Sequence, residues 1–243
     1  MIFLPKTNDK IFEKIISDLR TCFDSELISV VLYGSATGSG YVKGKSDINL
    51  LIILSSVAID KIDCLHSYLC DWHRCRVATP LFMTEDDIRS SLDVYPVEFI
   101  NIKKRYQILF GKDCISSLQF NSECVQMQME REFKGKLLLL RKSFVESRGK
   151  RKALINIASI SLTAIIANFC AFLSLKNEVV PLDDHAIIKK ACDYLHFNIN
   201  ALTTIMEMKC GNVHPSAKEL REIFKEYINT IDDLCRLIDE YKF

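Results

Sequence analysis

The sequence lacks a surplus of charge of either sign. Its 32 Lys and Arg residues oppose 31 Asp and Glu residues, so the formal net charge is +1 over 243 residues. Proteins that attract nucleic acid or an anionic membrane through their overall field carry a strong basic surplus. We therefore expect neither nucleic acid nor a membrane among the partners of this protein.

The sequence also lacks a CxxC pair and an export signal. Its ten cysteines are scattered, and the first ten residues, MIFLPKTNDK, soon turn polar. We therefore expect free thiols and a cytoplasmic location. A cluster of cysteines and histidines lacks the spacing of a zinc knuckle. It consists of Cys64, His66, Cys70, His73 and Cys75. They are expected to be ordinary residues of a helix, with a zinc site as the alternative.

Residues 153–175 are apolar enough to raise the question of a transmembrane helix. Polar side chains interrupt this stretch, Asn156 and Asn168 among them, and it lies within a series of helical patterns. A buried helix of a bundle is the interpretation that these features favour.

The character of the chain changes near residue 115. Before it, patterns typical of strands and helices alternate. Strands are expected at 28–34, 46–54, 76–83 and 93–102, a short apolar run lies at 106–110, and helices are expected at 10–22, 57–72 and from Thr84. Beyond residue 115, helices are expected at 123–147, 152–175, 183–196, 200–209 and 216–241. We thus expect an α/β domain over residues 1–115 and a helical domain over 116–243.

The most informative stretch runs from Val30 to Leu54, VVLYGSATGSGYVKGKSDINLLIIL. One buried strand ends at Gly34 and Ser35, and the next begins with Asp47 and Asn49. Because side chains two residues apart share a face of a strand, Asp47 and Asn49 are expected to point the same way. Glycine lets a backbone approach an anion closely, and oxygen ligands suit Mg²⁺. The pattern predicts a site for a triphosphate and its metal ion.

At these residues the sequence resembles the nucleotidyltransferase superfamily of DNA polymerase beta and the kanamycin (aminoglycoside) nucleotidyltransferases. The family pattern is Gly-Ser, a spacer, Asp-x-Asp on the next strand, and a third carboxylate on a later strand. The resemblance implies an α/β (α+β) nucleotidyltransferase domain with a mixed sheet, followed by an all-α helical bundle. It also implies transfer of a nucleoside monophosphate, AMP by default. The donor would be ATP or another nucleoside triphosphate bound to Mg²⁺ or Mn²⁺, and the acceptor a hydroxyl group on a small molecule or protein.

The resemblance assigns roles to individual residues. Gly34 and Ser35 would bind phosphate, and Asp47 would bind the metal ion. Glu98, on the expected strand 93–102, would be the third carboxylate, acting as general base or metal ligand. The alternatives are a plain tight turn at Gly34-Ser35, a capping role for Asp47, and an outward-pointing Glu98 on an edge strand, where Pro96 favours an edge position.

Asn49 departs from the family pattern. Its amide oxygen can coordinate a metal ion, but the negative charge of an aspartate is missing, which weakens the binding of a divalent cation. Two hypotheses follow: a transferase that works with Asp47 and Glu98, or a catalytically impaired nucleotide-binding or protein-interaction module. A polymerase acting on nucleic acid is disfavoured, because the basic surplus is missing.

Basic residues near the motif in sequence have two interpretations. They are either contacts to the triphosphate or solvated surface residues. These residues are Lys43, Lys45, Lys103, Lys104 and Arg105.

Overall fold

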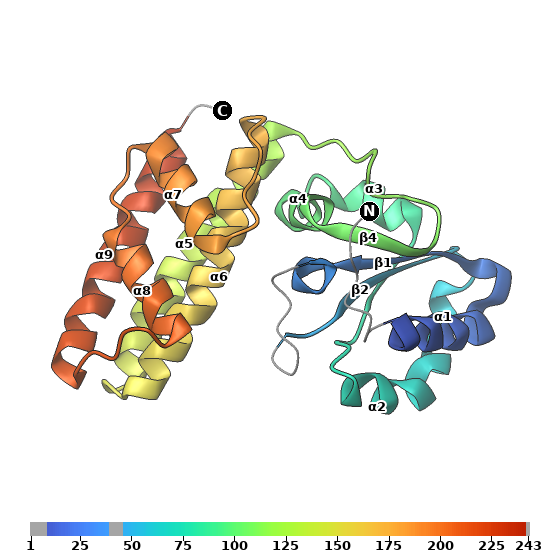
Figure 1. The fold of residues 1–243 in the computed structure, drawn as a ribbon. Coiled ribbons are helices and arrows are strands. Elements are labelled where there is room, and N and C mark those ends of the chain that lie inside the picture. Colours follow the sequence, from blue (N-terminus) through green and yellow to red (C-terminus); the bar gives the residue numbers. More distant parts are fainter. Residues whose placement is uncertain (1–8, 39–45, 242–243) are drawn as a thin grey trace. The chain divides into compact units, whose positions relative to one another are not determined.

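The computed structural model describes residues 9–38 and 46–241, which divide into two compact units (Figure 1). The sheet unit spans Met1–Val94 and Asn101–Gln119, and the helical unit spans Tyr95–Ile100 and Phe120–Phe243. The chain therefore passes between units more than once from residue 94 to residue 120, a stretch that includes the predicted division at residue 115.

The sheet unit is built on a mixed four-stranded sheet, as predicted. The strand order is β3-β2-β1-β4. The strands are β1 (Leu27–Tyr33), β2 (Asn49–Leu54), β3 (Leu81–Met83) and β4 (Tyr106–Gly111). Strand β1 is antiparallel to both β2 and β4, whereas β2 is parallel to β3.

Both faces of the two inner strands are buried. Val30 and Leu32 of β1 belong to a core that also contains residues of helix α1 (Asp9–Phe23). The residues that alternate with them point to the other face of the sheet. These are also fully buried, as Val31 of β1 and Leu51 of β2 show. Strands buried on both faces read as continuous apolar runs, which is why these two strands were predictable from the sequence.

Short helices complete the sheet unit. They are η1 (Asp24–Glu26), η2 (Gly34–Thr37), η3 (Ile59–Leu65), α2 (His66–Arg74) and α3 (Glu85–Ser91). Trp72 of α2 is buried and donates a hydrogen bond from Nε1 to Asp18 Oδ2 at 2.9 Å. Thr84 and Asp87 form a capping box at the start of α3, which confirms the helix predicted to begin at Thr84.

The strand predicted at 93–102 is wrong, because this segment contains helix α4 (Pro96–Lys104). Proline suits the first position of a helix, where its missing N–H would have no helical partner. Val97 and Ile100, three residues apart, enter the core of the helical unit together. An apolar run as dense as this one fits a buried strand and a buried helix equally well, and packing decides between them.

The helical unit contains the five long helices that the sequence predicted. They are α5 (Ser122–Glu146), α6 (Arg151–Leu175), α7 (Asp184–Leu195), α8 (Asn200–Cys210) and α9 (Ala217–Glu240). Among the described residues, α6 is the helix whose length and composition suffice to cross a membrane, and 61% of its most apolar window is buried. Its Leu162 and Phe169 are fully buried in the core of this unit, as the prediction of a bundle helix requires.

Two glycines provide a test of this packing. Gly111 ends β4 with φ of +78°, and a Cβ placed there lies 1.9 Å from the carbonyl oxygen of Ile28. We predict that Gly111→Ala lowers the free energy of unfolding by about 2–4 kcal/mol. Gly135 lies within α5 with open space around its Cα, so Gly135→Ala is expected to raise stability by about 1 kcal/mol. Urea denaturation followed by circular dichroism measures both changes, and an unaffected Gly111→Ala would contradict the strand pairing.

Candidate functional site

The pairing of three strands brings distant parts of the motif together at one edge of the sheet. In the register of β1, Tyr33 is opposite Asn49 of β2 on one side and Tyr106 of β4 on the other. Gly34 directly follows Tyr33, so the chain turns away from the sheet at this edge. Burial raises the pKa of the Tyr33 phenol, which therefore stays neutral at physiological pH.

The turn itself requires glycine. Gly34 has φ of +78°, and a Cβ placed there lies 3.4 Å from Asn49 Nδ2, so the Asn49 side chain lies directly against it. Ser35 follows in η2, where Thr37 Oγ1 donates a hydrogen bond to the Gly34 carbonyl at 2.8 Å. The structure thus brings Gly34, Ser35 and Asn49 together. The helix η2 is only four residues long, so it has no substantial helix dipole.

Arg105 supplies positive charge at this turn. Its carbonyl accepts a hydrogen bond from the Gly34 N–H at 3.1 Å. Its guanidinium lies against the turn, because a Cβ placed on Gly38 is 3.0 Å from Arg105 Nη2. Of the other basic residues near the motif, Lys43 and Lys45 lie outside the described residues. Lys103 Nζ donates a hydrogen bond to the Leu118 carbonyl at 2.7 Å. Arg105, one of the basic residues near the motif, therefore contacts the Gly34 turn through both its backbone and its side chain.

Asp47 lies two residues before β2 begins and is paired with a residue that the sequence did not single out. Its Oδ1 accepts from Arg76 Nη2 at 2.8 Å, with the two side chains 60% and 42% exposed. Arg76 follows α2 and precedes an isolated parallel bridge between Ile48 and Val77. The strand expected at 76–83 is shorter in the structure, where β3 begins at Leu81, and Arg76 precedes it.

Glu98 belongs to the helical unit, whereas Asp47 belongs to the sheet unit. Glu98 Oε2 accepts a hydrogen bond from Gln128 Nε2 at 2.6 Å. Gln128 is buried, and it also donates to Glu132 at 2.8 Å and accepts from the Val97 backbone N–H at 2.9 Å. Asn168 of α6 donates to Glu132 at 2.9 Å. Glu98 is therefore one end of a polar network within the helical unit, with Gln128 at its centre.

The sheet unit has less negative charge at the motif than the metal site that the resemblance implies. Mg²⁺ at such sites is usually bound through one or two carboxylates together with the phosphates of the substrate. Asp47 is ion-paired with Arg76, and Asn49 is neutral. Within residues 9–38 and 46–241, no three His, Cys, Asp or Glu side chains gather in a way that suits a metal ion. The same finding covers the cysteines and histidines between Cys64 and Cys75.

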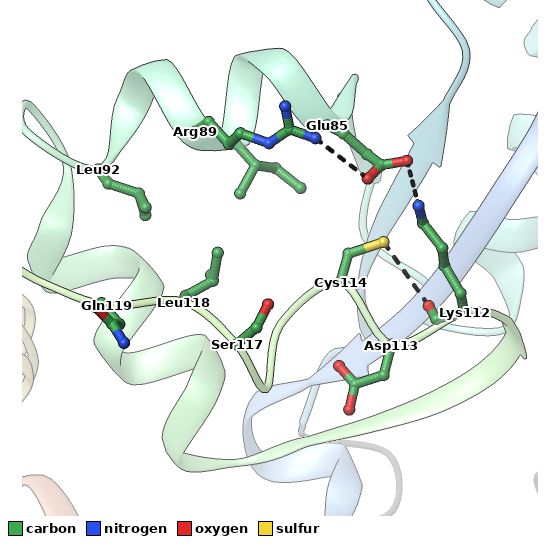
Figure 2. A pocket seen from close by; sticks show the side chains of 10 residues that line it. Glu85, Arg89, Leu92, Lys112, Asp113, Cys114, Ser117, Leu118 and Gln119 are labelled. Atoms are coloured by element: carbon green, nitrogen blue, oxygen red, sulfur yellow. Dashed lines mark hydrogen bonds and ion pairs between the residues drawn. The ribbon is translucent and has the colours of Figure 1, made fainter.

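A cavity of about 480 Å³ lies elsewhere in the sheet unit (Figure 2). Glu85 forms ion pairs with Lys112 at 2.6 Å and Arg89 at 3.6 Å at its rim. Lys112 follows Gly111, which pairs with Ser29 near the start of β1, whereas the Gly34 turn follows the end of β1. The cavity therefore lies at the opposite end of the sheet from the predicted site.

Comparison with known proteins agrees with this architecture. No protein-family model matches the chain, and no curated protein matches it in sequence. Among solved structures, the chain is similar to spectinomycin adenyltransferase AAD(9) from Enterococcus faecialis, solved with ATP and spectinomycin. The TM-score is 0.54 at 10% identity, and the match covers 90% of this chain and 97% of that one. The chain has the fold of a nucleotidyltransferase domain followed by a helical domain.

The polar network gives a testable consequence. We predict that Gln128→Ala lowers the free energy of unfolding by about 2 kcal/mol or more, because it leaves two carboxylates and a backbone N–H without their buried partner. Met127→Ala is the matched control, since Met127 is the neighbouring residue on α5 and is 72% exposed. Thermal denaturation compares the two variants, and equal melting temperatures would show that the network contributes nothing.

Proposed function

We propose that this protein binds a nucleoside triphosphate, ATP by default, at the sheet edge formed by Gly34, Ser35 and Arg105. The observation that carries the proposal is the double contact of Arg105 with the turn. Its carbonyl accepts the Gly34 N–H, and its guanidinium lies against Gly38. Arginine binds phosphate oxygens with two parallel hydrogen bonds, so this side chain suits a polyphosphate close to the backbone.

The roles of the neighbouring residues follow from their places. Gly34 lets the chain turn sharply and leaves no side chain in the way of an anion. Ser35 offers a hydroxyl at the same turn, and Asn49 offers an amide group directly against Gly34. Together these groups are neutral or positive, which favours a ligand with several negative charges.

Transfer of AMP to a hydroxyl group is the second candidate function. It is supported by the similarity to an adenyltransferase solved with ATP and spectinomycin, which extends over both units of this chain. In this candidate, Glu98 is the proposed base for the acceptor hydroxyl, and Asp47 is the proposed carboxylate of the sheet unit. The acceptor would be a small molecule such as an aminoglycoside, or a protein.

Isothermal titration calorimetry with ATP tests the binding proposal. We expect wild-type protein to bind ATP and Arg105→Ala to bind at least about ten-fold more weakly, because a charge-assisted bidentate contact is lost. Arg105 precedes strand β4 and Lys112 follows it. Lys112→Ala removes a positive charge at this other end of β4 and is expected to bind ATP like wild type. Absence of binding by the wild type, or an unchanged affinity of Arg105→Ala, would refute the site.

The same samples distinguish binding from transfer. Pyrophosphate release with Mg²⁺ and an aminoglycoside acceptor, lost in Glu98→Gln, would support transfer. Binding without release for any hydroxyl-bearing acceptor would leave nucleotide binding as the function.

A further inference from the structure

Arg76 has a backbone conformation that its residue type disfavours. Its φ is +61°, in the left-handed region. It occupies the position after α2 where the Arg76 N–H bonds to the His73 carbonyl at 2.9 Å and the Val77 N–H to the Trp72 carbonyl at 3.0 Å. Glycine, or less often asparagine, is the common residue at this position of a helix end. Residues held in strained backbone conformations are concentrated at functional sites, so the side chain of Arg76 is a candidate for a functional role.

The backbone around Arg76 is fixed beside the motif. The Arg76 carbonyl accepts a hydrogen bond from the Ile48 N–H at 2.9 Å, and the Ala78 N–H donates to the Ile48 carbonyl at 2.9 Å. The guanidinium returns to the same segment, with Nη2 at 2.8 Å from Asp47 Oδ1 and Nε at 3.3 Å from the Ser46 carbonyl. Three contacts of Arg76 therefore reach the segment from Ser46 to Ile48.

The position of Arg76 completes a row across the edge of the sheet. On one side of the row, the segment after Arg76 pairs with Ile48, just before β2. In the middle, Asn49 of β2 pairs with Tyr33 of β1. On the other side, Tyr33 pairs with Tyr106 of β4, which follows Arg105. Neighbouring strands are about 4.8 Å apart, so the two arginine-bearing segments stand about 14 Å apart on either side of the motif.

Charge in this row differs from that of the family pattern in two ways. Asn49 removes one negative charge from the pair of acids, and Arg76 adds a positive charge beside the acid that is left. In the family pattern, divalent cations provide the positive charge that phosphates need. Here the chain itself provides it.

We propose that Arg76 takes the place of a divalent cation at this edge, so that the site binds the phosphates of ATP without Mg²⁺. This inference rests on the proposed function. Asp47 then acts as a positioning residue that holds the guanidinium toward the edge. The Asp47 and Arg76 side chains are 60% and 42% exposed, so a phosphate can approach the guanidinium while the ion pair is kept. Its planar group of donors also serves Asp47 and a phosphate oxygen at the same time.

Calorimetric titration with ATP, in EDTA and separately in excess Mg²⁺, tests the inference. We expect wild-type protein to bind ATP with similar affinity in both buffers. Arg76→Gly, which suits the left-handed backbone and keeps the fold, is expected to bind at least about ten-fold more weakly in EDTA. Arg74→Ala is the control, because Arg74 is exposed and pairs with Asp71 at the end of α2. It is expected to bind like wild type.

Asn49→Asp tests whether a second acid makes ATP binding dependent on Mg²⁺. The added carboxylate restores the acid pair of the family pattern, so ATP binding in EDTA is expected to weaken and Mg²⁺ to restore it. The two proposals fail differently. Wild-type binding that requires Mg²⁺, or unchanged binding by Arg76→Gly in EDTA, would overturn the inference and leave the proposed function standing. No binding in either buffer would overturn both.

Discussion

The register of β1 between its two antiparallel neighbours is the constraint on which the candidate site depends. Tyr33 lies opposite Asn49 and Tyr106, and this pairing sets the Gly34 turn beside Asn49 and Arg105. Because β1 and β2 are buried on both faces, a shift of this register by one residue would require repacking of side chains on both faces. Burial of apolar side chains thus positions polar groups at the edge.

The charges at that edge explain why fold and activity must be considered separately. The fold is that of a nucleotidyltransferase domain with a helical domain, yet Asp47, the carboxylate of the motif among the described residues, is ion-paired with Arg76. Asn49 is neutral, and Glu98 belongs to a network in the other unit. This composition is the basis of the proposal that the edge binds phosphate without a divalent cation.

Local patterns were sufficient to predict much of this structure. The buried strands, the Gly34-Ser35 turn and the long helices all follow from periodicity and turn residues within one segment. The helix around Glu98 could not be predicted in this way, because a dense apolar run shows neither helical nor strand periodicity. This segment is helical because Val97 and Ile100 pack into the core of the helical unit. The roles of Arg76 and Gln128 depend on partners some 30 residues away along the chain, at Asp47 and Glu98, which no local pattern reveals.

The most direct test of the central claim is an NMR titration with ATP in EDTA, with amide and arginine Nε–H signals assigned. The account predicts that signals of Gly34, Ser35, Arg76 and Arg105 shift together as ATP is added, while Lys112, at the opposite end of the sheet, does not change. Shifts confined to Lys112 and its cavity, or no shifts until Mg²⁺ is added, would contradict it.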